Sequence, residues 1–251
     1  DSVCGNDTIY FVNHSLNSSF TWNFGDGDSS NLVNPAHAYD SSGVYDVIIS
    51  LTSLSHGCFN WDTITVNSLL SPEVIIDLDT IEGCSPLTIN FTNNSLNTDS
   101  YLWDFGDGNT SILTSLTNTY QNSGNYSGYL IGTNNNGCFD SISFNVISHP
   151  NPQLNFNYSF IDTCQLPMTV SFQNNSIGAN FFEWNFDGID SSNTTNPYFD
   201  FYLNGSYDII LVGENNFGCI DSILNTLLID TIPFAAFELD TLAGCIPLPV
   251  N

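Results

Sequence analysis

A period of about 80 residues constrains this 251-residue chain more than any other feature of its sequence. Trp22, Trp103 and Trp184 recur 81 residues apart, and each opens a turn rich in aromatic, glycine and aspartate residues. The seven cysteines follow the same period in two series: Cys4, Cys84, Cys164 and Cys245 form the first, and Cys58, Cys138 and Cys219 form the second. A fixed period of this length is typical of tandem modules. We therefore expect a string of copies of one domain.

Short proline-containing connections mark the module boundaries. We expect a first repeat over residues 1–70, a second over 71–150, a third over 151–231 and the start of a fourth over 232–251. The chain starts at Asp1 and stops inside the fourth repeat, so we interpret it as part of a longer polypeptide. A signal peptide, membrane anchor or sorting domain could lie outside the given residues. Proline restricts its own backbone and that of the preceding residue. The repeats are therefore expected to be stiffly joined, as an extended rod.

The second repeat has the pattern of a β-sandwich. Apolar and polar residues alternate over 74–78, 87–91, 126–133 and 142–146. Gly106-Asp107-Gly108 follows the Trp103 segment and predicts a turn that needs positive φ. No segment shows the helical period. About seven short strands with a core on alternate residues predict an all-β fold of two packed sheets.

The charge balance excludes several partners. Lys and Arg are absent, and 26 Asp and Glu residues give a formal net charge of -26. Without basic side chains the chain has nothing to replace the counterions of nucleic acids or anionic lipids, so we expect neither as a partner. No apolar run is long enough to insert into a membrane. The acidity favours either bound metal cations or simple solubility of a crowded surface protein.

Two groups of motifs carry a family resemblance. Trp103-Asp104-Phe105-Gly106-Asp107-Gly108 of the second repeat, together with Pro35-Ala36-His37-Ala38-Tyr39 and Gly43-Val44-Tyr45-Asp46-Val47 of the first, resembles the polycystic kidney disease (PKD) domain. The resemblance covers the chain as three near-complete copies and the start of a fourth, and it implies tandem immunoglobulin-like β-sandwiches. The Gly-Cys pairs further resemble those of disulfide-bearing PKD repeats in giant surface proteins of gliding Bacteroidetes. The third repeat departs from the pattern, because Asp187 replaces the glycine after Phe186. We expect a differently shaped turn there.

The cysteine spacing predicts one disulfide within each repeat. The expected pairs are Cys4–Cys58, Cys84–Cys138 and Cys164–Cys219, with Cys245 bonded to a partner beyond residue 251. Each bond would close a loop of about 55 residues, worth roughly 4 kcal/mol in the chain-entropy model. A metal site is less well supported, because the cysteines lie far apart without a CxxC or nearby His pattern. Disulfides predict an oxidising, extracellular location at the cell surface.

Calcium is the one cofactor that the sequence suggests. Asp26, Asp107 and Asp187 lie in glycine-containing turns, and tight turns can direct several oxygens at a hard cation. No EF-hand or nonapeptide calcium pattern is present. The other interpretation is that these aspartates accept hydrogen bonds from the amides of their own turns. His37 is expected to pack and form a hydrogen bond rather than to bind a ligand.

Asp followed by Thr or Ser and then an apolar residue resembles the acceptor of Bacteroidetes O-glycosylation. The motif marks Thr8, Thr63, Thr80, Ser141, Ser222, Thr231 and Thr241. Of these, Thr63, Ser141 and Ser222 hold nearly equivalent repeat positions. The alternative is that Asp simply precedes a strand that begins with Thr or Ser and an apolar residue.

The sequence gives little support for catalysis. Neither Gly-x-Ser-x-Gly nor His-Glu-x-x-His occurs, and an active site is rarely copied three times at a fixed spacing. We predict a non-enzymatic extracellular segment of a giant surface adhesin or filament. The resemblance implies export by the type IX secretion system, a role in attachment or gliding, and contacts with outer-membrane secretion or motility machinery.

Further partners are expected to be neighbouring repeats and a surface polysaccharide or substratum. The first alternative function is a spacer array in a secreted polysaccharide- or protein-degrading enzyme. A second alternative, glycan binding by the modules themselves, would need exposed aromatic platforms. Trp61 has no counterpart in the other repeats. It is either an exposed contact or a local packing variant, and we favour packing.

Overall fold

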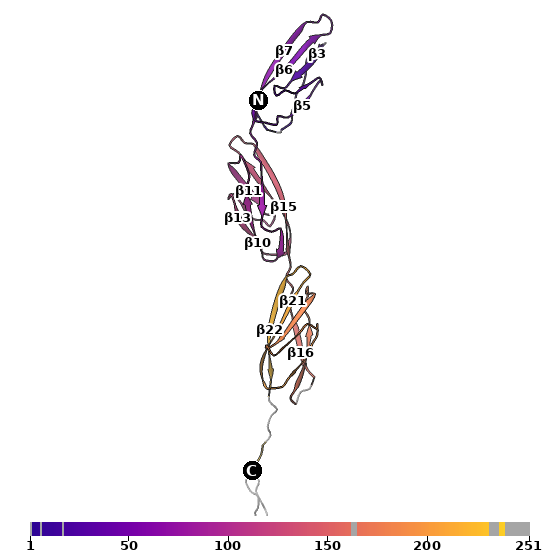
Figure 1. The fold of residues 1–251 in the computed structure, drawn as a ribbon, viewed down its shortest axis with the longest axis vertical. Coiled ribbons are helices and arrows are strands. Elements are labelled where there is room, and N and C mark those ends of the chain that lie inside the picture. Colours follow the sequence, from indigo (N-terminus) through magenta and orange to yellow (C-terminus); the bar gives the residue numbers. More distant parts are fainter. Residues whose placement is uncertain (1, 6, 17, 162–164, 231–235, 239–251) are drawn as a thin grey trace, which may run out of the picture. The chain divides into compact units, whose positions relative to one another are not determined.

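The computed structural model describes residues 2–5, 7–16, 18–161, 165–230 and 236–238. Regular structure in this part of the chain is all β, so it contains no helix that could span a membrane. The chain divides into two compact units, residues 1–148 and 149–251. The regular elements drawn in both units are strands (Figure 1). Three separate hydrophobic cores are present, one in each of the first three repeats. The all-β prediction of tandem immunoglobulin-like sandwiches is confirmed.

The first repeat combines a five-stranded and a two-stranded sheet. Its strands are β1 (Ser2–Cys4), β2 (Ile9–Tyr10), β3 (Ser18–Asn23), β4 (Ser29–Ser30), β5 (Ala36–His37), β6 (Gly43–Ser53) and β7 (Phe59–Leu69). They pair in the order β1-β7-β6-β3-β4, and β2 pairs with β5. β1 runs parallel to β7, with Cys4 opposite Leu69, whereas the other pairs are antiparallel.

The second repeat places a three-stranded sheet against a five-stranded one. Its strands are β8 (Ile76–Leu78), β9 (Glu82–Cys84), β10 (Leu87–Asn93), β11 (Ser100–Asp104), β12 (Thr110–Ser111), β13 (Leu116–Tyr120), β14 (Gly124–Thr133) and β15 (Phe139–His149). The sheet orders are β13-β10-β8 and β12-β11-β14-β15-β9.

The third repeat has the same plan without a described counterpart of β9. Its strands are β16 (Phe156–Phe160), β17 (Met168–Asn174), β18 (Phe181–Phe186), β19 (Asp190–Ser192), β20 (Tyr198–Phe201), β21 (Gly205–Glu214) and β22 (Ile220–Ile229). The sheet orders are β16-β17-β20 and β19-β18-β21-β22.

Alternation along the strands builds each core. In β10, Leu87, Ile89 and Phe91 are buried, while Thr88 and Asn90 are exposed. Successive strand residues point to opposite faces, so one face enters the core and the other meets solvent. Burying one such large apolar side chain contributes roughly 1.5–3 kcal/mol. The two-residue alternation in the sequence therefore identified the buried face correctly.

The repeated tryptophan anchors each core by packing and by one hydrogen bond. Trp103 is fully buried, and its Nε1 donates to Leu113 O at 2.9 Å. Trp22 donates to Leu32 O at 3.2 Å, and Trp184 donates to Thr194 O at 3.0 Å. The acceptor lies ten residues downstream each time, so the indole N–H is satisfied in each of the first three repeats.

The turn after the tryptophan differs in the third repeat, as its sequence predicts. In the second repeat, Gly106 adopts φ of +75°, and a Cβ there would lie 2.3 Å from Ser127 O. In the third repeat, Asp187 adopts φ of +54° and its amide donates to Asp208 O at 3.0 Å. The carbonyl of Phe186 then accepts from the amide of Ile189 at 3.0 Å.

In the first two repeats a buried tyrosine satisfies that same carbonyl. The hydroxyl of Tyr39 donates to Phe24 O at 2.9 Å, and that of Tyr120 donates to Phe105 O at 3.2 Å. Phe201 holds the equivalent place in the third repeat and has no hydroxyl. The tighter turn at Asp187 therefore replaces the tyrosine hydrogen bond with a backbone one.

The tyrosine hydrogen bonds predict an alkaline limit for the first two repeats. Burial is the main reason that the pKa values of Tyr39 and Tyr120 rise from 10.0 to about 12. The carboxylates of Asp26 and Asp107, respectively, contribute to this rise, and for Tyr120 a hydrogen bond with Asn118 partly offsets it. A phenol whose folded pKa exceeds its unfolded pKa stabilises the fold fully below pH 10, and this contribution falls as pH rises from 10 through 12. We expect hydrogen-exchange protection to weaken over that range in the first two repeats.

The third repeat supplies the control for the alkaline experiment, because Phe201 does not ionise. A Tyr120→Phe variant should lose about 1 kcal/mol at neutral pH, since one buried hydrogen bond is removed. The same variant should make the second repeat less sensitive to alkali. Equal alkaline sensitivity of the wild-type and Tyr120→Phe second repeats would contradict the assignment.

Candidate functional site

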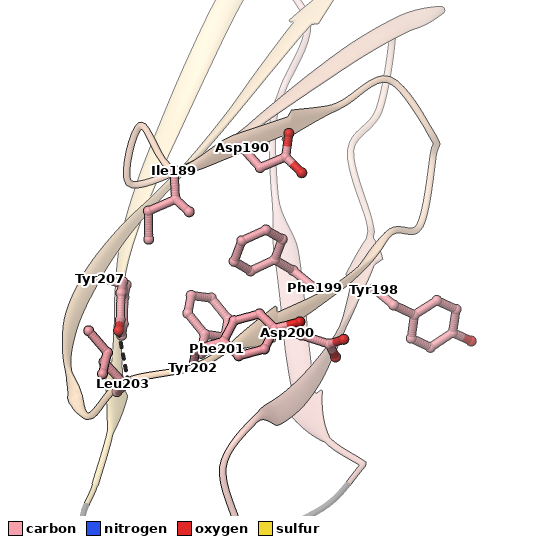
Figure 2. Close-up of a pocket in the computed structure, with 9 residues that line it drawn as sticks. All are labelled: Ile189, Asp190, Tyr198, Phe199, Asp200, Phe201, Tyr202, Leu203 and Tyr207. Carbon is pink, nitrogen blue, oxygen red and sulfur yellow. Dashed lines mark hydrogen bonds between the residues drawn. The ribbon is translucent and has the colours of Figure 1, made fainter.

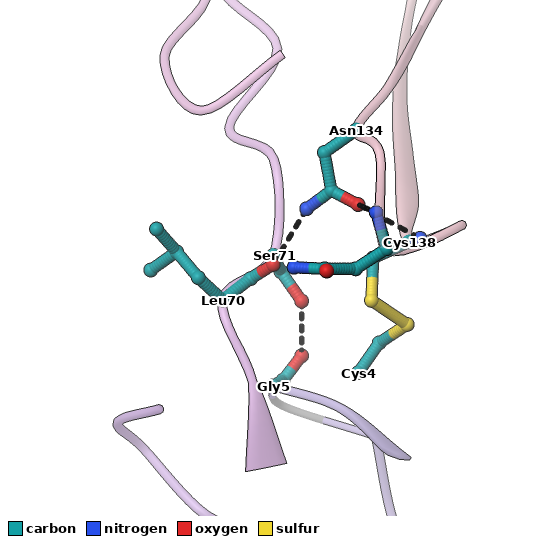
Figure 3. Close-up of a disulfide and its surroundings, with 7 residues drawn as sticks. Cys4, Gly5, Leu70, Ser71, Asn134 and Cys138 are labelled. Atoms are coloured by element: carbon teal, nitrogen blue, oxygen red, sulfur yellow. Dashed lines mark hydrogen bonds between the residues drawn. A yellow bond between two sulfur atoms is a disulfide. The ribbon is translucent and has the colours of Figure 1, made fainter. Parts of the chain in front are cut away.

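A disulfide joins the first repeat to the second. The sulfurs of Cys4 and Cys138 are 2.02 Å apart, with their Cα atoms 5.6 Å apart (Figure 3). Both residues belong to the first compact unit. Cys4 ends β1, and Cys138 lies in the hairpin between β14 and β15. The bond therefore lies at the connection around Ser71.

The predicted pairs Cys4–Cys58 and Cys84–Cys138 are wrong. Cys4 lies opposite Leu69 at the end of β7, whereas Cys58 directly precedes Phe59 at its start. The eleven residues of β7 place its two ends ten steps, or about 33 Å, apart. A disulfide needs Cα atoms within about 7 Å. The register of β1 on β7, which places Cys4 opposite Leu69, thus rules out a Cys4–Cys58 bond.

The other cysteines divide into bonded, free and undescribed ones. Cys84 and Cys219 are each disulfide-bonded. Cys58 is exposed and free. Cys164 and Cys245 lie outside the described residues, so the predicted Cys164–Cys219 pair and the partner of Cys245 stay predictions.

Hydrogen bonds hold the connection beside the disulfide. Ser71 Oγ donates to Gly5 O at 2.8 Å, and Asn134 Nδ2 donates to Leu70 O at 2.7 Å (Figure 3). Asn134 Oδ1 also accepts from the amide of Cys138 at 3.1 Å. One asparagine thus fixes the cysteine hairpin and the connecting segment together. We call the Cys4–Cys138 bond and these hydrogen bonds the clasp.

The third repeat carries the asparagine part of the clasp within its own unit. Asn215 is 81 residues after Asn134 and is 5% exposed. Its Nδ2 donates to Pro150 O at 2.8 Å, and its Oδ1 accepts from the amide of Cys219 at 3.0 Å. The ring of Phe217 stacks on His149 with centroids 4.0 Å apart. Sequence reasoning missed these asparagines, although each precedes a second-series cysteine by four residues.

The first aspartate turn forms a small polar cluster. His37 Nε2 lies 2.6 Å from Asp26 Oδ2, and its ring stacks on Phe24 at 4.1 Å. The amide of Asp28 donates to Asp26 Oδ1 at 3.0 Å. Ligand atoms of Asp26, Asp28 and His37 lie within 4.8 Å of one another. His37 is thus packed and hydrogen-bonded, as expected.

In the second repeat, the amide groups of Asn109 and Asn118 surround the turn aspartate, Asp107. Asp107 Oδ1 accepts from the amide of Asn109 at 2.9 Å. Its Oδ2 accepts from Asn109 Nδ2 at 3.0 Å and from Asn118 Nδ2 at 2.9 Å. Asn118 is the counterpart of His37, 81 residues later. Capping of the turn amides accounts for Asp26 and Asp107, and calcium binding at Asp26, Asp107 or Asp187 stays a prediction.

The Asp26 contacts predict acid sensitivity of the first repeat. Burial alone raises the pKa of Asp26, but the hydrogen bond from the Asp28 amide and the contact with His37 together lower it below 3.8. A carboxyl with a depressed folded pKa stabilises the fold above its unfolded pKa, and this contribution falls as pH drops below about 4.

An Asp26→Asn variant tests this contribution. The variant should destabilise the first repeat by roughly 1 kcal/mol at neutral pH. Hydrogen-exchange protection of the first repeat should then depend less on pH between about pH 4 and 2 than it does in the wild type. Asp208→Asn, in the third repeat, is the control and should leave the first repeat unchanged. An unchanged pH dependence in Asp26→Asn would contradict the role assigned to Asp26.

The predicted glycosylation acceptors lie mostly at the surface. Thr8, Thr63, Ser141 and Ser222 are exposed and Thr80 is half-buried, while Thr231 and Thr241 lie outside the described residues. The aspartate before Thr63, Ser141 and Ser222 accepts the hydrogen bond of the acceptor's own amide at 2.8–2.9 Å. This contact supplies a structural reason for the motif, and modification stays a prediction.

A pocket of about 560 Å³ in the third repeat collects aromatic side chains (Figure 2). Tyr198 and Tyr202 are each 68% exposed, and Asp190 and Asp200 also line the pocket. Thr117 and Gln121 stand at the corresponding positions of the second repeat. Trp61, expected to pack, is 59% exposed in β7. Within the described residues, the exposed tyrosines of this pocket therefore have no aromatic counterparts in the second repeat.

Comparison with known proteins identifies the modules. The family model for the PKD domain matches residues 12–67 and 71–149. The chain belongs to the PKD domain family. The PKD1 domain of the Vibrio cholerae metalloprotease PrtV is 30% identical to it, covering 31% of this chain and 96% of that domain with a TM-score of 0.28. The PKD1 domain of Vibrio anguillarum Epp is 24% identical, covering 32% and 95% with a TM-score of 0.29.

A structure described as informing host cell surface retention of a 1.5-MDa bacterial ice-binding adhesin matches over more of the chain. It is 10% identical, covering 92% of this chain and 94% of that one with a TM-score of 0.37. The modules that the family model matches are PKD domains, which are non-catalytic. Disulfide-bonded PKD modules indicate an extracellular protein.

Proposed function

We propose that this chain is a segment of a non-enzymatic extracellular stalk, belonging to a giant surface adhesin or filament used in attachment. The observation that carries the proposal is the clasp. The first and second repeats are held by the peptide connection and by the Cys4–Cys138 bond beside it. Two covalent links across one joint restrict bending and twisting more than a single linker does, and a stalk that projects an adhesive tip needs such joints.

The surface chemistry supports the same role. The chain has 26 acidic and no basic residues, so extracellular proteases that cut after Lys or Arg find no site in it. Like charges along the chain also disfavour collapse of repeats onto one another. Bacteroidetes origin, type IX export and a role in gliding follow from the resemblance of the Gly-Cys motifs and are part of this proposal.

The alternative is a spacer array in a secreted degradative enzyme. The PKD1 domain that is 30% identical to this chain comes from a metalloprotease, which is the observation in favour. A spacer would need the same stiff joints, so the clasp does not separate the two roles. The two roles differ in what the repeats are attached to, which is an adhesive tip in one case and a catalytic domain in the other.

Antibody labelling of intact source cells separates the two proposals. An antibody against the repeats should label surface fibres, and its Fab fragments should block attachment to a solid surface. Fab fragments of an unrelated antibody against another surface protein serve as the control. Label found on a soluble secreted protein, with attachment intact, would favour the enzyme spacer and overturn the stalk.

A further inference from the structure

Cys58 occupies the position in the first repeat that Cys138 occupies in the second. Its carbonyl accepts from the amide of Ser53 at 2.9 Å, as the carbonyl of Cys138 accepts from the amide of Asn134 at 2.9 Å. A glycine with positive φ precedes both cysteines, +67° at Gly57 and +82° at Gly137. The first hairpin is one residue longer, yet each cysteine directly precedes the phenylalanine that starts the next strand.

The surroundings of these equivalent cysteines differ. Cys138 is fully buried and bonded to Cys4. Cys219, the third-repeat counterpart, is also fully buried and disulfide-bonded. Cys58 is exposed and has a free thiol. Thus the position that is covered and bonded in two repeats is open in the first.

The clasp gives each module two different ends. The first-series cysteine lies beside the last residues of the module's long strand, as Cys4 lies opposite Leu69. The second-series cysteine lies in the hairpin at the opposite end, as Cys58 precedes Phe59. A head-to-tail contact pairs one end with the other, which is what Cys4 and Cys138 do. The hairpin of the first repeat therefore fits the first-series end of another module.

We propose that Cys58 forms a disulfide with the first-series cysteine of a further PKD module placed before residue 1 in the same polypeptide, as Cys138 does with Cys4. The inference holds whether the stalk serves an adhesin or an enzyme. Bond formation removes two protons and two electrons from the two thiols. Oxidised glutathione supplies the oxidant, and its disulfide is reduced to two glutathione thiols.

The joint at Cys58 would depend on its disulfide more than the joint at Cys138 does. Ser53 holds the position in the first repeat that Asn134 holds in the second. Asn134 donates a hydrogen bond to Leu70 O, whereas Ser53 Oγ lies 3.2 Å from Ser55 Oγ in its own hairpin. A serine side chain is too short to hold both the hairpin and a preceding connection. The cysteine is then the element of the clasp that the first repeat retains.

An extended chain tests the proposal. A second copy of residues 1–80 placed before residue 1 puts the copy's Cys4 134 residues before Cys58, the separation of Cys4 from Cys138. The copy carries Cys58→Ser, so that one Cys58 remains, and Ser2→Thr as a mass mark. After oxidation with glutathione, alkylation of Cys58 should fall at least about tenfold, because the tether raises the effective thiol concentration. Peptide mapping should link Cys58 to the copy's Cys4.

Two controls keep the test decisive. Moving the thiol by Cys58→Ser with His56→Cys leaves it in the same exposed hairpin and should leave it alkylated. A second extension made from residues 81–160 presents Cys84 in place of the copy's Cys4 and should give the same bond. The proposal is overturned if Cys58 stays alkylated in both extended chains while Cys4–Cys138 forms, or if the moved thiol bonds equally well.

Discussion

Replacing Trp103 with alanine is expected to destabilise the second repeat by about 3–5 kcal/mol. Trp103 is fully buried, its ring centroid lies 5.5 Å from that of Phe91, and it donates to Leu113 O. The change removes a large aromatic surface, opens a cavity and leaves that carbonyl without its donor. Since small domains are stable by only about 5–15 kcal/mol, the second repeat should become largely unfolded on mild heating.

Hydrogen exchange resolved by peptide is the measurement for Trp103→Ala. Protection should fall over β10, β11 and β14 and persist over β17, β18 and β21, because the repeats have separate cores. Trp61→Ala is the matched control, since Trp61 is 59% exposed and its loss should cost no more than about 0.5 kcal/mol. Equal losses of protection in the two variants would contradict the packing described here.

Replacing Cys138 with serine is expected to have the second large effect. The Cys4–Cys138 bond spans 134 residues, and closing a loop of that size is worth up to about 5 kcal/mol in the chain-entropy model. Because each repeat keeps its own core, the loss should be concentrated at the joint. Amides near Leu70 and at the 134–138 hairpin should exchange faster, and denaturant unfolding of the first unit should shift to lower concentration.

Cys58→Ser provides the comparison for Cys138→Ser. Both changes remove a sulfur from a hairpin at the same repeat position, but Cys58 has a free thiol. Cys58→Ser should therefore change stability by no more than about 0.5 kcal/mol. A loss in Cys58→Ser as large as that in Cys138→Ser would mean that the first-series bond had been placed on the wrong partner.

Local patterns allowed the fold to be predicted from the sequence. Alternation in segments such as 87–91 depends on neighbours along one strand, and the turn at Gly106 depends on backbone sterics. The altered third turn was likewise visible, because Asp187 replaces a glycine. Capping by Asp26 and Asp107 was among the stated alternatives for the same reason.

Disulfide partners could not be predicted in this way. The sequence does not show which end of β7 Cys4 lies against. The pairing register of β1 decides it, because Cys4 lies opposite Leu69 at the end of β7. Sequence separation favoured the short loop, but the register of β1 placed Cys4 at the far end of β7, more than about 30 Å from Cys58. The clasp asparagines Asn134 and Asn215 were missed because turns rich in asparagine are common.

Non-reducing peptide mapping of the intact chain tests the joint most directly. Trypsin has no site in a chain without Lys or Arg, so free thiols are first alkylated and the chain is then cut at its acidic residues. We predict one linked pair containing Cys4 and Cys138, with Cys58 recovered as its alkylated form. A linked pair containing Cys4 and Cys58 would contradict the account and return the disulfide to the interior of a single repeat.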